Sequence, residues 1–194
     1  MRGVSFRLAS GSSLLIIGPN GCGKTTLLKI IAGLLRPTRG TVLVYGATPT
    51  TVEAKRLFGI VLDHPMLYRE LTVEENLRLF ASLYGVENYE PSSDEIVEML
   101  GLRRWLGVKV GELSFGWRKR ADIARAMIHR PKLLIVDEPL NGLDTGAAET
   151  VSELLRLHVS KNKGIVLAAS PTEQSLLDWM EHGRIVEGKL VVGR

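Results

Sequence analysis

Several features are scarce in this 194-residue sequence, and each scarcity excludes a class of protein. The chain contains one cysteine, which excludes an internal disulfide and is typical of a protein from a reducing compartment. No apolar run approaches the roughly 20 residues that a membrane-spanning helix needs. Neither sign of charge is in large excess, because the net charge is +4. That balance favours a generally solvated surface over one that binds anionic lipid, and we expect no nucleic-acid partner.

The rest of the composition is that of one globular domain. Hydrophobic residues make up 45% of the chain and charged residues 24%, which is enough apolar side chain for a sizeable core. Segments with strand and helix patterns alternate along the sequence. We expect strands over residues 4–8, 14–17, 41–45, 58–62, 132–137 and 165–169, with a hairpin over 184–192. We expect helices over residues 25–35, 72–84, 116–129, 145–159 and 176–180.

The middle of the chain is mainly helical. Capping boxes at Thr72 with Glu75 and at Ser92 with Glu95 indicate two helix starts. Strands and helices alternate on both sides of this stretch, which favours a parallel α/β sheet. The sequence therefore predicts a single α/β domain over 1–194. Its core, with a mainly parallel sheet, covers about 1–70 and 131–194, and an inserted α-helical subdomain covers about 71–130.

A phosphate-binding loop follows the predicted strand at 14–17. The loop fits the pattern G-x-x-x-x-G-K-[ST] and lies between a strand and a helix, as its mechanism requires. Glycines let backbone N–H groups close around phosphate oxygens, and the N-terminus of the following helix favours an anion. Lys24 is expected to reach the β and γ phosphates of ATP, and Thr25 to bind Mg²⁺. The predicted ATP-binding residues of this loop are Gly18, Pro19, Asn20, Gly21, Cys22, Gly23, Lys24, Thr25 and Thr26.

Two carboxylates end the apolar strand predicted at 132–137. Asp137 follows four apolar residues, and Glu138 comes next. A carboxylate at the end of a buried strand can hold Mg²⁺ or its water, so Asp137 is a predicted metal ligand. Glu138 is the predicted catalytic residue that polarises the attacking water or accepts its proton.

Between the loop and the carboxylates lies Leu113-Ser114-Phe115-Gly116-Trp117. This stretch opens a predicted helix, and in this order and spacing the three motifs resemble the ATPase subunits of ABC transporters. The family signature is LSGGQ, so Ser114 and Gly116 match, Phe115 replaces a glycine and Trp117 replaces a glutamine. The resemblance implies that Ser114 and Gly116 bind the ATP held by a second ABC ATPase subunit, in a homodimer or heterodimer. The same resemblance implies a P-loop NTPase fold with a RecA-like core.

Three family features are missing from the sequence. In the family, an aromatic residue that stacks on adenine lies about 20 residues before the segment that resembles residues 3–6. This sequence starts at that segment, so none of its residues corresponds to this aromatic. Asp63 stands where the family has the glutamine of its Q-loop, and it is a predicted Mg²⁺ ligand. Ser170 stands where the family has a switch histidine that contacts the γ-phosphate. A hydroxyl cannot supply a cationic contact, so we expect Ser170 to act in catalysis with slow hydrolysis.

The resemblance implies an ATP-binding and ATP-hydrolysing subunit that powers export through a separate membrane-spanning subunit. Such a protein lies on the cytoplasmic face of the cell membrane. The segment 68–77, continuing to 83–85, resembles exporters of the ABC-2 kind and is similar to the haem-exporter ATPase of cytochrome c maturation. Two alternatives stay open: a soluble ABC ATPase of the iron–sulfur assembly kind that transports nothing, and a degenerate subunit that hydrolyses ATP weakly within a heterodimer.

Overall fold

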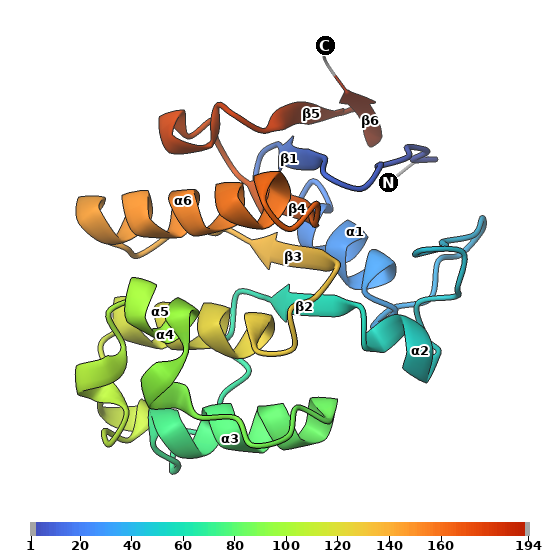
Figure 1. Cartoon of the computed structure of the whole chain (residues 1–194). Coiled ribbons are helices and arrows are strands. Elements are labelled where there is room, and N and C mark those ends of the chain that lie inside the picture. Colours follow the sequence, from blue (N-terminus) through green and yellow to red (C-terminus); the bar gives the residue numbers. More distant parts are fainter. Residues whose placement is uncertain (1–2, 193–194) are drawn as a thin grey trace.

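A six-stranded sheet forms the centre of the molecule in a computed structural model that describes residues 3–192 (Figure 1). The strands are β1 (Ser13–Ile17), β2 (Phe58–Val61), β3 (Leu133–Asp137), β4 (Ile165–Ser170), β5 (Glu181–Val186) and β6 (Lys189–Val192). Their order in the sheet is β2-β3-β4-β1-β5-β6. All neighbours are parallel except β5 and β6, which form an antiparallel hairpin. The predicted α/β class with a mainly parallel sheet is confirmed.

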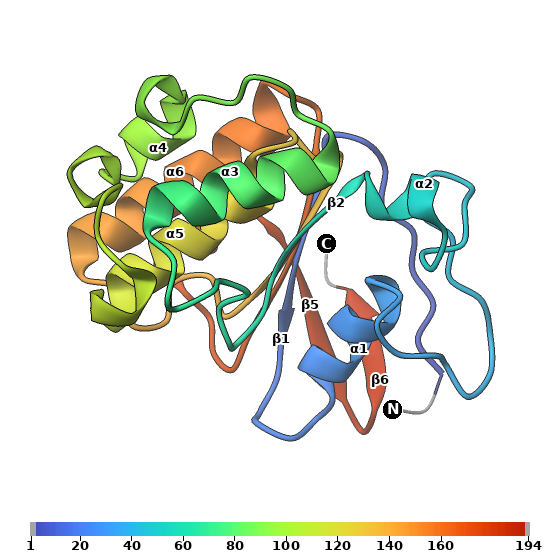
Figure 2. The same cartoon turned by 90° about the horizontal axis from the view of Figure 1, so that it is seen from below.

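Helices cover both faces of this sheet (Figure 2). They are α1 (Lys24–Ile31), α2 (Val52–Lys55), α3 (Val73–Tyr84), α4 (Glu95–Met99), α5 (Phe115–Met127) and α6 (Thr145–Ser160). Alternate strand residues enter two cores, since Leu14 and Ile16 pack with α1, whereas Leu15 and Ile17 pack on the side of α3 to α6. Each such side chain contributes about 1.5–3 kcal/mol by its burial. The continuous apolar strands of the sequence therefore reflect burial from both sides.

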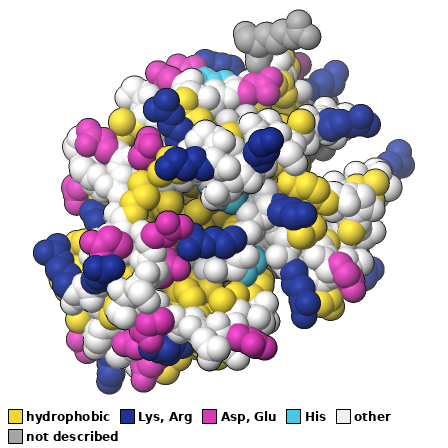
Figure 3. Space-filling model, viewed as in Figure 1, with side chains coloured by type: hydrophobic (Ala, Val, Ile, Leu, Met, Phe, Trp, Pro, Cys, Tyr) yellow, Lys and Arg dark blue, Asp and Glu magenta, His cyan; other side chains and the backbone are white. Residues whose placement is uncertain are grey.

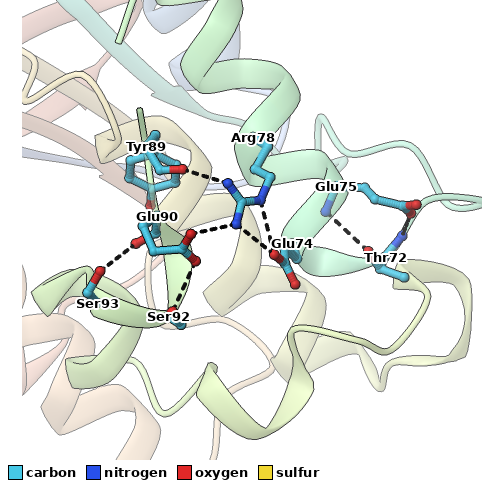
Figure 4. Close-up of polar contacts among 8 residues, drawn as sticks. All are labelled: Thr72, Glu74, Glu75, Arg78, Tyr89, Glu90, Ser92 and Ser93. Atoms are coloured by element: carbon cyan, nitrogen blue, oxygen red, sulfur yellow. Dashed lines mark hydrogen bonds and ion pairs between the residues drawn. The ribbon is translucent and has the colours of Figure 1, made fainter. Parts of the chain in front are cut away.

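The predicted start of α3 is confirmed by its hydrogen bonds. The N–H of Glu75 donates to Thr72 Oγ1 at 3.1 Å, and the N–H of Thr72 donates to Glu75 Oε2 at 2.7 Å (Figure 4). Further along α3, Arg78 forms ion pairs with Glu74 and Glu90. These exposed pairs hold the end of the connection to α4 against α3 and contribute little to stability.

The second predicted capping box is wrong. Asp94 caps α4, because its Oδ1 accepts the N–H groups of Ile96 at 2.8 Å and Val97 at 3.1 Å. Ser92 lies instead in a single 3₁₀ turn, Pro91–Ser93, and its hydroxyl donates to Glu90. An aspartate beside the first turn also places negative charge at the positive end of the helix, which a serine two residues earlier does not.

Two predicted strands do not form. Residues 4–8 are irregular, and residues 41–45 contribute only the isolated bridge from Val44 to Ala47. Among the described residues, no backbone hydrogen bond joins 4–8 to a neighbouring strand. Alternation of apolar residues predicts a strand only where a partner edge is available. Two predicted helices are shorter in the structure than expected. The helix predicted over 25–35 ends at Ile31, and residues 176–180 contribute only to a 3₁₀ turn, Ser175–Leu177.

Helix α5 lies directly against the edge strand β2. A Cβ atom on Gly59 of β2 would come within 2.3 Å of the carbonyl oxygen of Ala126 in α5, so this approach requires glycine. Helices α3, α4 and α5 group together beside this edge (Figure 1). The boundaries of the helical subdomain near 71 and 130 stay a prediction.

Candidate functional site

The predicted phosphate-binding loop connects β1 to α1, as its mechanism requires. Gly23 has a φ of +105°, a conformation that favours glycine, and it leads directly into the first turn of α1. The ammonium group of Lys24 donates to the carbonyl oxygens of Gly18 at 2.6 Å and Pro19 at 3.2 Å. The loop therefore curls around the lysine side chain, and a bound phosphate would compete with these carbonyls for its N–H groups.

The carboxyl end of β3 meets the start of α1. The hydroxyl of Thr25 donates to Oδ2 of Asp137 at 2.6 Å. A cavity of about 490 Å³ opens beside this contact. Its lining consists of Asn20, Gly21, Gly23, Lys24, Thr25, Thr26, Lys29, Leu62, Asp63, His64, Asp137 and Glu138. Most of the predicted loop residues, both carboxylates after β3 and Asp63 thus lie around one cavity.

Glu138 is held in a strained backbone conformation. Its φ is +48°, which costs an L-residue about 1–2 kcal/mol. Its N–H donates to the carbonyl of Ala169 at 2.8 Å, and its Oε2 accepts from the side-chain amide of Asn141 at 2.8 Å. These contacts hold the carboxylate at the cavity, the position from which it could polarise a water molecule.

Asp137 is almost fully buried, and a lysine supports it from α5. The ammonium group of Lys119 donates to the backbone carbonyl of Asp137 at 2.9 Å. Burial lowers the pKa of Lys119, while the nearby carboxylates of Asp122, Asp137, Glu138 and Asp63 oppose that shift. Lys119 therefore links the carboxylates around the cavity to the buried face of α5.

Two polar cavity residues, as well as the apolar Leu62, were missed by sequence reasoning. His64 follows Asp63 directly after β2, and Lys29 lies one turn along α1 from Thr25. The sequence places His64 just after a predicted strand, but the pairing of β2 with β3, which brings it to the same edge as Asp137, is seen only in the structure. Lys29 carried the signal of helical spacing, four residues after Thr25 on the same helix face.

The signature segment lies away from this cavity. Ser114 caps α5 by accepting the N–H of Trp117 at 3.5 Å, and neither Ser114 nor Gly116 is among the cavity residues. The indole of Trp117 packs at 5.0 Å from that of Trp105, with the guanidinium of Arg120 4.2 Å from its ring centre. Trp117 is thus anchored within its own chain, while Phe115 is 41% exposed.

Ser170 is fully buried at the end of β4 and is also not among the cavity residues. Its hydroxyl accepts the N–H of Thr172 at 3.4 Å. Its backbone carbonyl accepts the N–H of Gly18 at 3.3 Å, so this position adjoins the phosphate-binding loop through the backbone. The predicted catalytic role of the Ser170 hydroxyl stays a prediction.

The oxygen donors of the cavity fit Mg²⁺. The hydroxyl of Thr25 and the carboxylate of Asp137 are neighbours at one side, and Asp63 lines the same cavity. Mg²⁺ is usually bound by one or two carboxylates together with phosphate oxygens and water. No group of three or more His, Cys, Asp or Glu ligands occurs among residues 3–192. Thr25, Asp137 and Asp63 are thus the residues that would hold the ion.

Comparison with known sequences gives consistent matches. A sequence model described as "ABC transporter" matches residues 1–141. An uncharacterised ABC transporter ATP-binding protein from Bacillus subtilis is 36% identical over 169 residues, covering 86% of this chain and 54% of that protein. The Nod factor export ATP-binding protein I from a Rhizobium species is 34% identical, covering 97% of this chain and 65% of the relative. The chain thus spans between half and two thirds of the length of these two relatives.

Solved structures match over nearly the whole chain. The ATP-binding subunit of an ABC transporter superposes with a TM-score of 0.88 at 29% identity, covering 98% of this chain and 81% of the other. A dimeric ATP-binding cassette in a post-hydrolysis state, bound to ADP and Pi, gives a TM-score of 0.84 at 26% identity, covering 96% of this chain and 86% of the other. The predicted P-loop NTPase fold is confirmed. In the described part of the chain, no helix is both long and apolar enough to cross a membrane.

Proposed function

The chain belongs to the ABC transporter family, and from that premise we propose that it is an ATP-binding and ATP-hydrolysing subunit that powers a separate membrane-spanning chain. The observation that carries this proposal is the single cavity that Lys24, Thr25, Asp137 and Glu138 share. These residues come from a phosphate-binding loop and from the neighbourhood of a buried parallel strand. This arrangement suits the β and γ phosphates of a nucleotide.

Each cavity residue has a distinct role in the proposed reaction. Lys24 leaves the Gly18 and Pro19 carbonyls and binds the β and γ phosphates. Thr25, Asp137 and Asp63 hold Mg²⁺, which neutralises charge on the phosphate oxygens when it is bound. Glu138, held by Asn141, orients the attacking water and accepts its proton.

We propose that the active form is a dimer in which Ser114 and Gly116 of one chain contact the nucleotide of the other. Two observations support this. Ser114 and Gly116 do not reach the cavity of their own chain, although they open α5 and its N-terminus favours an anion. The solved ATP-binding cassette with bound ADP and Pi is dimeric. The proposed location is peripheral, on the cytoplasmic face of the membrane, where the transmembrane chain would dock.

Export of the ABC-2 kind is the proposed direction of transport. The relatives include proteins named for Nod factor export and bacitracin transport, but also one named for taurine import. The resemblance of segment 68–77 to ABC-2 exporters favours export, and a haem-exporter type is one member of that class. A second candidate, a weakly hydrolysing subunit of a heterodimer, is favoured by the burial of Ser170 away from the cavity.

Calorimetric titration with MgATP tests the nucleotide site. We expect the wild-type chain to bind and Lys24→Ala to bind at least about tenfold more weakly, because a charge-assisted bond to phosphate is worth about 1.5–3 kcal/mol. Lys55→Ala is the matched control, since Lys55 is an exposed lysine on α2 that does not line the cavity. Equal affinity of wild type and Lys24→Ala would contradict the proposal.

A further inference from the structure

Three buried charged residues lie along one face of α5. Lys119, Asp122 and Arg125 follow one another at intervals of three residues, and their exposures are 3%, 0% and 2%. Burying charge costs free energy unless each group is paired and hydrogen-bonded. A row of three on the helix that packs against β2 therefore requires specific partners on the sheet side.

The two cations of this row bind backbone carbonyls at the ends of neighbouring strands. Lys119 donates to the carbonyl of Asp137 at the end of β3, at 2.9 Å. Arg125 donates through Nη2 to the carbonyl of Ile60 in β2, at 2.5 Å. The row thus joins α5 to β2 and β3, two of the strands whose following residues line the cavity.

Asp122 holds the far end of the segment that leaves β2. Its Oδ1 accepts three N–H groups: the backbone N–H of Met66 at 3.1 Å, and Nε and Nη2 of Arg125 at 3.0 and 2.7 Å. Asp63 and His64 lie between Ile60 and Met66, so both sides of the segment that presents them are tied to α5. Few backbone conformations can close so short a span between two fixed ends.

The buried ion pair with Arg125 uses only one oxygen of this carboxylate. Its second oxygen, Oδ2, is buried and has no hydrogen-bond partner in the described structure. A buried polar atom without a partner is destabilising, so the pairing of Asp122 with Arg125 still carries a cost at Oδ2. A buried polar atom that lowers stability in this way is expected where the residue serves a function.

We propose that Asp122 is a positioning residue for Mg²⁺-dependent nucleotide binding. By fixing the N–H of Met66 it holds Asp63 at the cavity that Thr25 and Asp137 also line. The phosphate-binding loop follows β1, and the hydrogen bonds of Asp122 in the described structure go to Met66 and Arg125, so binding of ATP without Mg²⁺ does not depend on it. This inference rests on the proposed function.

Calorimetric titration with ATP, once in Mg²⁺ and once in EDTA, separates the Mg²⁺-dependent part of nucleotide binding from the part that the phosphate-binding loop supplies. We expect Asp122→Ala to weaken MgATP binding by about five- to tenfold, the loss that corresponds to one net hydrogen bond. Binding of ATP in EDTA should change by less than about twofold, because the glycine loop is intact. Met66→Pro removes the N–H that Asp122 accepts and should show the same selective loss.

Two matched variants keep the hydrogen bond. Met66→Ala retains the backbone N–H and should bind MgATP like the wild type, since the Met66 side chain is exposed. Asp122→Asn retains an acceptor oxygen and should recover most of the affinity that Asp122→Ala loses. Loss of both forms of binding to the same degree would show a purely structural role and overturn the inference. Unchanged MgATP binding in folded Met66→Pro would also overturn it. A folded wild-type chain that binds neither MgATP nor ATP in EDTA would refute the proposed function as well.

Discussion

Ser170 is the position at which the predicted chemistry departs furthest from the family pattern. Its hydroxyl is buried and accepts from Thr172, and the nearby carbonyl accepts from Gly18. We expect Ser170→His to raise steady-state phosphate release by about one to two decades, because a charge-assisted contact to the γ-phosphate is worth about 1.5–3 kcal/mol. Ser170→Ala should change the rate by less than about threefold, since only one long hydrogen bond is lost.

Both variants need the same check of fold, by circular dichroism and by the affinity for MgATP. A wild-type rate that is already typical of the family, with no gain from histidine, would contradict slow hydrolysis. It would mean that another group supplies the contact, and His64 is the cavity residue best suited to do so.

Most of the residues around the cavity could be predicted from the sequence because their positions depend on local geometry. A glycine loop between a strand and a helix sets its own conformation, so Lys24 and Thr25 lie where the pattern places them. The contributions of His64 and Lys119 depend on which strands are neighbours, and a single sequence does not show this. The chemistry of Lys119 was hidden further, since a lysine in a basic helix is normally solvated.

At the scale of elements, His129 joins α3, α5 and β2. It follows α5, its ring stacks on Tyr84 at the end of α3 with centres 3.7 Å apart, and its Nε2 donates to the carbonyl of Phe58 at 2.7 Å. The pKa of His129 is lowered from 6.5 to about 4, mainly by burial, with a smaller contribution from the nearby Arg125 and opposition from the hydrogen bond to Phe58. The folded protein therefore keeps this ring neutral at pH values where the unfolded chain protonates it.

This pKa shift predicts a loss of stability in acid. Because the unfolded state binds the proton more readily, stability falls as the pH drops from about 6.5 towards 4. Between pH 7 and pH 5 the wild type should lose up to about 2 kcal/mol more than His129→Gln, which keeps a donor for Phe58. Urea denaturation at both pH values measures this difference, and an equal loss in the two proteins would contradict the assignment.

Elements with local signals or continuous apolar runs were predictable, whereas an alternating pattern did not show whether a partner strand was present. The capping box of Thr72 and Glu75 forms as the sequence indicates. The alternating residues 4–8 look equally convincing in sequence, yet they remain irregular because no strand pairs with them in the described structure. The choice of Asp94 over Ser92 as a cap was decided by which residue directly precedes the first turn of α4.

At the scale of the whole molecule, the chain presents a nucleotide cavity and a signature segment at separate places. Positive and negative side chains are interspersed over the face shown in Figure 3, which matches the small net charge of the sequence. In the dimer that we propose, two chains meet head to tail, so that the signature segment of one chain and the cavity of the other contact the same nucleotide. Only the family resemblance predicted a head-to-tail dimer. The residues of a surface that binds a second chain show no periodic pattern in the sequence.

The molar mass of Glu138→Gln with and without ATP tests this account most directly. Glutamine removes the proton acceptor but keeps the shape of the side chain, so ATP should persist between two chains. Light scattering should then give twice the 21.4 kDa of one chain in MgATP and a monomer without nucleotide. Adding Ser114→Arg should abolish the dimer while leaving nucleotide binding intact. A monomer at millimolar ATP, both alone and after mixing with a complete ABC ATPase subunit, would contradict the account.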